Sequence, residues 1–335
     1  MRIYLDNSAT TNTDKRVVES MLPYMTEVYG NASSLHGFGR EAAAAVDEAR
    51  AKIAAVFNAK PQEIYVTSGG TESDNWALRG VAHANAKEGK HIITTAVEHP
   101  AIMQTCKQLE KEGFSITYLP TGTDGRIRLE DLKAAVRDDT ILVSVMFANN
   151  ETGAIMPIKE IGAFCKENGI IFHTDAVQAI SSIKIDVDEY GIDLLSLSAH
   201  KFHGPKGIGL LYIRNGVKID RLMFGGHQER AYRPGTTNTP GIVGMAKALE
   251  LCVAEMDENN AKIKAMRDRF IERVQKEIPD CRLNGGTEHR LVSNANFSFD
   301  YIEGESILMT LDLNGIAVSS GSACSSGSPA RIRAS

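Results

Sequence analysis

Short apolar runs alternate with helical stretches through the middle of the chain. Residues 42–57 combine strong helix formers with the apolar spacing of an amphipathic helix. Runs of strand length, most of them nearly continuously apolar, occupy residues 63–67, 91–95, 140–148, 169–173, 193–198 and 207–213. Continuously apolar strands are typical of a parallel sheet that helices cover on both faces. The alternation therefore predicts an α/β fold with a mostly parallel central sheet.

The pattern changes beyond residue 240. Residues 241–277 have the spacing of a long helix, which we interpret as a connection into a second unit. Residues 291–299 predict a strand, residues 305–313 a helix, and residues 315–318 another strand. This part of the chain is therefore expected to form a small α+β domain.

These patterns divide the chain into two predicted domains. The large domain is expected to span residues 15–250, and the small domain to combine residues 1–14 with residues 251–335. Residues 319–335 are rich in Ser and Gly, so we expect this part of the small domain to be mobile.

Composition and charge narrow the class of protein. The 335 residues are 43% hydrophobic and 24% charged, as in ordinary globular proteins, which excludes a disordered or coiled-coil chain. With 37 basic and 42 acidic residues, the net charge of −5 gives no electrostatic reason to expect nucleic acid or an anionic membrane as partner. No apolar run approaches the length of a membrane span, and residues 1–11 lack the features of a signal peptide.

The cysteines point to a reducing compartment. There are five, far apart and without a C-x-x-C pair: Cys106, Cys165, Cys252, Cys281 and Cys324. This arrangement argues against a disulfide framework and against a structural zinc site, so we predict no metal and a cytoplasmic location. Cys324 alone lies in a Ser/Gly-rich stretch, where it is either an incidental surface thiol or an accessible nucleophile.

Two polar side chains follow predicted strands of the sheet. Lys201 lies in a turn of Ser, His, Lys and Gly residues after residues 193–198, and Asp175 follows residues 169–173. In open α/β sheets, ligands bind beyond the carboxyl ends of the strands. Lys201 could be an imine-forming amine or a solvated surface lysine. Asp175 could hold a proton on a ring nitrogen or cap the next helix.

Two further segments also follow predicted strands of the sheet. Residues 67–74, including Gly70 and Thr71, open a predicted helix directly after a strand, which suits a phosphate cradle or a simple helix cap. His99 follows residues 91–95 and could act as an acid or base, stack on a planar ring, or be a satisfied turn histidine. An imine lysine, a pyridinium aspartate, a phosphate cradle and a ring-side histidine together indicate pyridoxal 5′-phosphate (PLP).

The chain strongly resembles the cysteine desulfurases, PLP enzymes of fold type I in the class V aminotransferase group. The resemblance rests on motifs spread over nearly the whole chain: YLDNSATT (4–11), NASSLHGFGREA (31–42), SGGTESDN (68–75), VEHPA (97–101), ANNETGAIMPI (148–158), HTDAVQ (173–178), SAHKFHGPKGIG (198–209), RPGTTN (233–238) and SSGSACSSGS (319–328). It implies a large PLP-binding domain with a mostly parallel sheet and a small α+β domain that carries the mobile nucleophile loop.

The resemblance also implies roles for individual residues. Lys201 would form the imine with PLP and move the substrate's α proton, and Cys324 would accept the sulfur as the nucleophile. His99 would stack on the ring and shuttle protons. The remaining implied contacts are Asp175 with the ring nitrogen, Gln178 with the phenolic oxygen, Asn150 near the substrate carboxylate, and Gly70, Thr71, Ser198 and His200 with the phosphate. Thr236 would contact the phosphate of the other subunit, which implies a homodimer.

The implied function is PLP-dependent removal of sulfur from L-cysteine, giving L-alanine and an enzyme persulfide. The persulfide sulfur would pass to an acceptor such as an iron–sulfur scaffold protein or another sulfur-trafficking protein. The alternatives are a selenocysteine lyase, another class V aminotransferase-like PLP enzyme, and a non-catalytic scaffold. Because the family usually continues well beyond the nucleophile loop, we expect a shortened C-terminus, with Arg331 and Arg333 as remnants of the strand that carries the substrate-carboxylate arginine.

Overall fold

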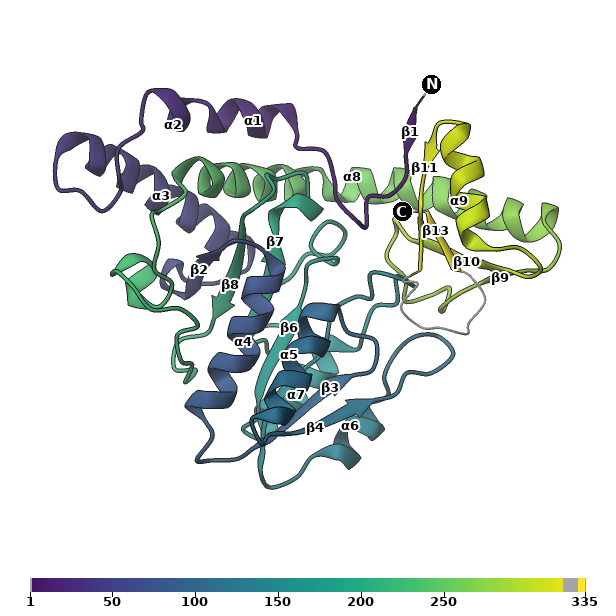
Figure 1. Ribbon diagram of the computed structural model, residues 1–335, viewed down its shortest axis with the longest axis horizontal. Helices are drawn as coiled ribbons and strands as arrows, with labels where there is room; N and C mark the ends of the chain where they lie inside the picture. The colour runs from purple at the N-terminus through teal and green to yellow at the C-terminus, as the bar shows by residue number, and fades with distance from the viewer. Residues whose placement is uncertain (1, 322–330, 335) are drawn as a thin grey trace.

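The computed structural model describes residues 2–321 and 331–334. Its main sheet has seven strands in the order β2-β8-β7-β6-β5-β3-β4 (Figure 1). The strands are β2 (Ile64–Thr67), β3 (His91–Thr95), β4 (Ser115–Leu119), β5 (Thr140–Ser144), β6 (Ile171–Asp175), β7 (Leu194–Ser198) and β8 (Gly209–Ile213). Only β8 runs against its neighbours: it is antiparallel to β2 and β7, and the other neighbouring pairs are parallel.

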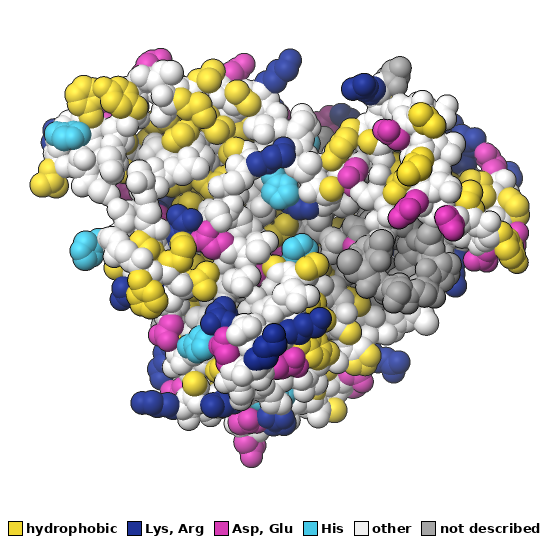
Figure 2. Space-filling view, viewed as in Figure 1, with side chains coloured by type: hydrophobic (Ala, Val, Ile, Leu, Met, Phe, Trp, Pro, Cys, Tyr) yellow, Lys and Arg dark blue, Asp and Glu magenta, His cyan; other side chains and the backbone are white. Residues whose placement is uncertain are grey.

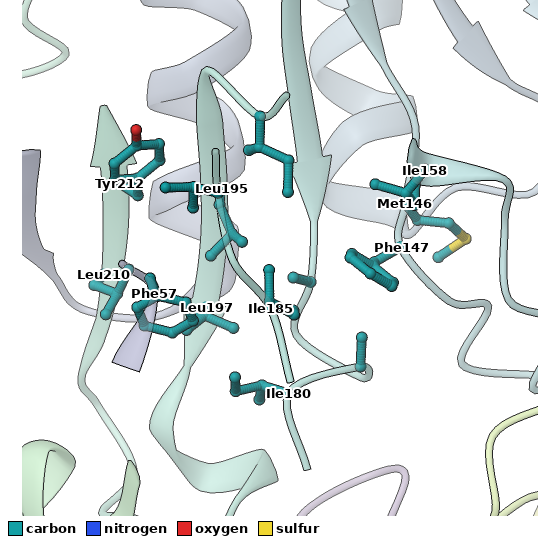
Figure 3. Packing of buried hydrophobic residues seen from close by; sticks show 14 of the residues in the cluster. Phe57, Met146, Phe147, Ile158, Ile180, Ile185, Leu195, Leu197, Leu210 and Tyr212 are labelled. Carbon is teal, nitrogen blue, oxygen red and sulfur yellow. The ribbon is translucent and has the colours of Figure 1, made fainter. Parts of the chain in front are cut away.

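Helices cover both faces of this sheet: α3 (Gly37–Val56), α4 (Gly70–Ala84), α5 (Pro100–Lys111), α6 (Leu129–Ala135), α7 (Ile158–Glu167) and α8 (Thr239–Glu277). Two further helices, α1 (Lys15–Met21) and α2 (Pro23–Thr26), pack against α8. Because successive strand residues point to opposite faces, Leu195 packs in one core cluster with α3, α7 and α8, whereas Leu194 packs in another with α4 and α5. Figure 3 shows the first of these clusters around Phe57, Leu197 and Tyr212.

A second, smaller sheet forms at the far end of α8 (Figure 1). Its order is β12 (Ser319–Ser320), β13 (Arg331–Ala334), β10 (Ala295–Phe299) and β9 (Cys281–Leu283), all antiparallel, with α9 (Gly304–Leu313) beside it. Strand β1 (Ile3–Tyr4) pairs in parallel with β11 (Ile316–Ala317), so the N-terminal segment joins the C-terminal part of the chain.

The predicted α/β class is confirmed, and most predicted elements lie within a few residues of the observed ones. The predicted strand 140–148 is too long, because β5 ends at Ser144, although the backbone N–H groups of Val145 and Phe147 still donate to carbonyls of β6. The expected mobile segment 319–335 is wrong in part, because residues 319–320 and 331–334 form strands. Within the described residues, no helix has both the length and the apolar character needed to cross a membrane.

Candidate active site

The parallel strands bring the predicted residues to one edge of the sheet. Asp175 is the last residue of β6, and Ser198 is the last residue of β7. Helix α4 begins three residues after β2 ends, at Gly70, and His99 follows β3 by four residues as the N-cap of α5. Since β2, β3, β6 and β7 point in the same direction, their carboxyl ends meet there.

A cavity of about 650 Å³ opens at this edge, a size typical of sites for small molecules. Nine of the predicted site residues line it: Gly70, Thr71, His99, Asn150, Asp175, Gln178, Ser198, His200 and Lys201. Two predicted residues lie elsewhere. Thr236 lines a neighbouring cavity of about 180 Å³, which shares Ser68 and Gly207 with the first. Cys324 lies outside the described residues.

Lys201 is held at the end of a short 3-10 turn, residues Ala199–Lys201. Its Nζ donates to the backbone carbonyls of Ser8 and Ala9, the latter at 2.9 Å. Burial lowers the pKa of the Lys201 amine, although the negative charges of Asp175 and Asp6 oppose this shift. A lowered pKa increases the fraction of neutral amine, which is the nucleophilic form.

Asp175 is buried beside Lys201 and His99. Its Oδ1 accepts a hydrogen bond from the backbone N–H of Val177 at 2.9 Å. Burial raises the pKa of Asp175, whereas the Val177 hydrogen bond and the charges of His99 and Lys201 lower it. Burial is the largest of these effects, so the pKa of Asp175 is raised overall, and the opposing contacts limit the rise.

Two histidines of the cavity are kept neutral by their surroundings. Nδ1 of His99 accepts from the backbone N–H of Ala101 at 3.1 Å, which leaves the proton of a neutral ring on Nε2. Burial and the charge of Lys201 lower the pKa of His99, although Asp175 opposes the shift. Burial and the charges of Lys201 and Lys206 lower the pKa of His200 to about 4.

The start of α4 forms a tight polar cradle. Gly69 has φ of 154°, a conformation that non-glycine residues rarely adopt, and it turns the chain from β2 into the helix. A Cβ on Gly70 would lie 3.0 Å from Cγ2 of Val177 and 3.7 Å from Cβ of Ser198. The first amides of a helix have no intrahelical partner, so this N-terminus suits an anion.

Sequence reasoning missed several side chains of the cavity. Asp74 lies one helical turn after Gly70, so its i, i+4 spacing is a signal that could have revealed it. Lys206 adds a second positive charge to the lining, and its place in the turn after β7 was visible in the sequence. Ser8 and Ala9 belong to a distant N-terminal segment, and no local pattern places them beside Lys201.

Comparison with known proteins agrees with this geometry. Residues 3–335 match the family described as aminotransferase class-V. The protein named cysteine desulfurase IscS in Methanosarcina thermophila is 57% identical over 326 residues, which cover 97% of this chain and 80% of that protein. A solved structure described as a NifS-like protein has a TM-score of 0.95 at 40% identity, covering 99% of this chain and 93% of the other. A second, described as SspA in complex with cysteine, has a TM-score of 0.85 at 36% identity, covering 96% and 90%.

The chain therefore belongs to the class V aminotransferases, a family of PLP-dependent enzymes of fold type I. Within this family it belongs to the cysteine desulfurases. The expectations of a PLP fold, of PLP as cofactor and of desulfurase activity are confirmed.

The cavity fits this cofactor. A buried carboxylate suits a protonated ring nitrogen, a buried amine with a lowered pKa suits imine formation, and a helix N-terminus suits the phosphate. The cradle is also too narrow at Gly70 for an added Cβ without movement of Val177. Asp175, Lys201 and the Gly70–Thr71 turn would therefore hold the three polar parts of the cofactor.

Proposed function

We propose that this enzyme takes its sulfur from L-cysteine, releases L-alanine and carries the sulfur as a persulfide on Cys324. The observation that carries the proposal is that Lys201, Asp175 and His99 line one cavity with a helix N-terminus beside them. The solved structure described as SspA in complex with cysteine, 36% identical to this chain, supports the choice of substrate.

PLP, when bound, supplies a protonated ring that withdraws electrons from the substrate's Cα. Asp175 keeps the proton on the ring nitrogen, and Gln178 hydrogen-bonds the phenolic oxygen. Lys201, as a neutral amine, takes the proton from Cα and returns a proton during turnover. His99 covers the ring and, being neutral, can pass a proton through its Nε2.

Other residues of the cavity bind the phosphate of the cofactor and the carboxylate of the substrate. Thr71, Ser198 and His200, with the backbone at Gly70, hold the cofactor phosphate, and Lys206 adds positive charge. Asn150 lies near the substrate carboxylate.

The sulfur step belongs to Cys324. Its thiolate attacks the sulfur of the bound substrate, so that an S–S bond forms while the substrate's Cβ–S bond breaks. The electron pair of the broken bond stays on Cβ, where a proton completes the methyl group of alanine. The persulfide sulfur then passes to an acceptor thiol, on an iron–sulfur scaffold or another sulfur carrier. Such chemistry needs reduced thiols, which supports a cytoplasmic setting.

The proposed enzyme is a homodimer. Thr236 lies outside the cavity that holds the other predicted contacts, as a residue that serves a second copy would. Large apolar side chains also gather over α1, α2 and the start of α3 (Figure 2), a surface that burial in an interface would remove from water. Its exposed members are Val18, Leu22, Met25, Tyr29, Leu35 and Phe38.

We also propose that residues 15–250 form the large domain and that residues 1–14 and 251–335 together form the small domain. Two observations support it: β1 pairs with β11, and the strands of the two larger sheets come from separate parts of the sequence. The N-terminal segment would then link the small domain to Lys201, since it carries both β1 and the carbonyls of Ser8 and Ala9.

Intact mass spectrometry tests the proposed nucleophile. Incubation of the PLP-loaded enzyme with L-cysteine should add sulfur to the wild-type chain but not to Cys324→Ala. That variant should keep the visible absorption of the bound cofactor, because Cys324 has no part in holding it. Cys281→Ala, which removes a half-buried thiol elsewhere, serves as the control and should gain sulfur normally. Undiminished sulfur addition in Cys324→Ala would refute the assignment.

A further inference from the structure

The segment before Thr236 has an unusual backbone. Glu229, Arg230 and Ala231 have φ values of 45°, 58° and 67°, three successive non-glycine residues in the left-handed region. Each such residue is strained relative to the right-handed conformation, and the arrangement persists only where the surroundings hold it. Side chains from neighbouring elements hold this turn in place.

A buried ion pair fastens the first of these residues. The carboxylate of Glu229 accepts from Nη1 and Nη2 of Arg50 at 2.9 and 2.6 Å, and from the backbone N–H of Val66 at 3.0 Å. The side chains of Arg50 and Glu229 are only 10% and 8% exposed, so water screens their attraction little. Arg50 also donates to the carbonyl of Ile64 at 2.6 Å. The carboxylate of Glu229 thus binds β2 directly, through the N–H of Val66, and indirectly, through Arg50 of α3.

Two further arginines attach the same segment. The guanidinium of Arg230 lies 4.0 Å from the ring centre of Tyr65 and donates to the carbonyl of Ile64 at 2.9 Å. Arg233 donates to both carboxylate oxygens of Glu72, at 2.8 and 3.1 Å. These attachments end on β2, which leads into the phosphate cradle, and on the first turn of α4, which belongs to it. Side-chain contacts therefore join this segment to the cradle.

We propose that Glu229 is a positioning residue for the cofactor phosphate of the other subunit. Paired with Arg50, it fixes the left-handed turn and so sets the place from which Thr236 is presented to a second copy. This inference rests on the proposed homodimer. It assigns the ion pair a function in trans, beyond the stability of its own subunit.

A cofactor titration tests the first part of this proposal. Apoprotein carrying Glu229→Gln should bind PLP about tenfold more weakly, the equivalent of one hydrogen bond to a charged group, as followed by visible absorption. Arg50→Lys, which keeps the charge but loses the paired donors, should fall between this variant and the wild type. Asp193→Asn is the control, because it removes one of the two carboxylate partners of a half-buried arginine, Arg214, outside the cavity. Wild-type affinity in Glu229→Gln would overturn the proposal.

Hybrid dimers test whether the effect crosses between subunits. One subunit carries Lys201→Ala with Glu229 intact, and its partner carries Glu229→Gln with Lys201 intact. Only the second subunit can form the absorbing imine, and Thr236 of the first subunit serves it. We expect wild-type affinity at one site per dimer. Weak PLP affinity at that site in a dimeric hybrid would overturn only the proposal that Glu229 acts on the other subunit. A monomeric wild-type protein would overturn both this proposal and the proposed homodimer.

Discussion

Among single side chains, burial raises the pKa of three carboxyls at this edge of the sheet, Asp74, Glu98 and Asp175. Burial first, and then the charges of Asp175 and Glu98, raise the pKa of Asp74 well above its ordinary value. Burial raises the pKa of Glu98 to about 8, despite its hydrogen bonds from Thr95 and the backbone of Met146. Glu98 is therefore mostly neutral at pH 7, and the pKa of Asp74 is shifted in the same direction. Of the three carboxyls, Asp175 is the one whose pKa the positive charge of Lys201 lowers, and it is the one that a pyridinium needs to be ionised.

The protonated state of Glu98 predicts a pH dependence of stability. Its folded pKa of about 8 lies above that of an unfolded glutamate, so its contribution is complete below about pH 4 and is lost as the pH rises through about 8. Glu98→Gln should remove this loss of stability at high pH, because a glutamine side chain does not ionise. The wild-type free energy of unfolding should fall relative to the variant by up to about 1.4 kcal/mol per pH unit between about pH 5 and 8.

Denaturant unfolding of the apoprotein at several pH values measures this difference. Glu167→Gln, at an exposed position near the end of α7, is the control and should follow the wild type. A difference between Glu98→Gln and the wild type that stays constant with pH would show that Glu98 is already ionised in the folded protein.

At the level of helices and strands, the phosphate cradle depends on the absence of a side chain at the start of α4. In Gly70→Ala the new methyl group would press on Val177, 3.0 Å away, and push the helix N-terminus from the phosphate. We expect PLP affinity to fall on the order of tenfold. The melting temperature of the apoprotein should change little, because the helix preference of alanine over glycine offsets part of the cost of the contact with Val177. Unchanged affinity for PLP would contradict the cradle.

The elements that carry chemistry were largely predictable from sequence, because each follows a run of strand residues. Asp175, His99 and the Gly70 turn were identified this way, since parallel strands place such turns at one edge. The approach of Ser8 to Lys201 was not predictable, because the two residues are 193 positions apart and no local pattern encodes their contact. The left-handed turn at Glu229 was equally hidden, since its residues carry no glycine to mark it.

For the whole molecule, the proposed dimer makes a prediction about the apolar surface on α1–α3. Leu35 is 91% exposed there, and Leu313 is 88% exposed on α9, at the opposite end of the molecule (Figure 1). Leu35→Glu should shift the sedimentation coefficient toward that of a monomer, because a buried carboxylate in the interface would be unpaired. Leu313→Glu should leave the protein dimeric. Equal behaviour of the two variants would argue against this surface as the interface.

The overall architecture followed from hydrophobic patterning, but its finer assembly did not. The continuously apolar strands predicted a covered parallel sheet, and the change of pattern beyond residue 240 predicted a second α+β unit. The pairing of β8 with β2 and of β1 with β11 depends on contacts between distant segments. Ser and Gly composition also misrepresented residues 331–334, which pair with β10 in the small sheet.

The central claim is that Lys201 binds the cofactor as an imine opposite Asp175. Borohydride reduction of the PLP-loaded protein, followed by peptide mapping, tests it most directly. The account predicts a pyridoxyl group on the peptide that contains Lys201, one per chain, and none at Lys206, which lines the same cavity. A pyridoxyl group on Lys206 instead, or an unmodified Lys201 in a fully loaded protein, would contradict the account.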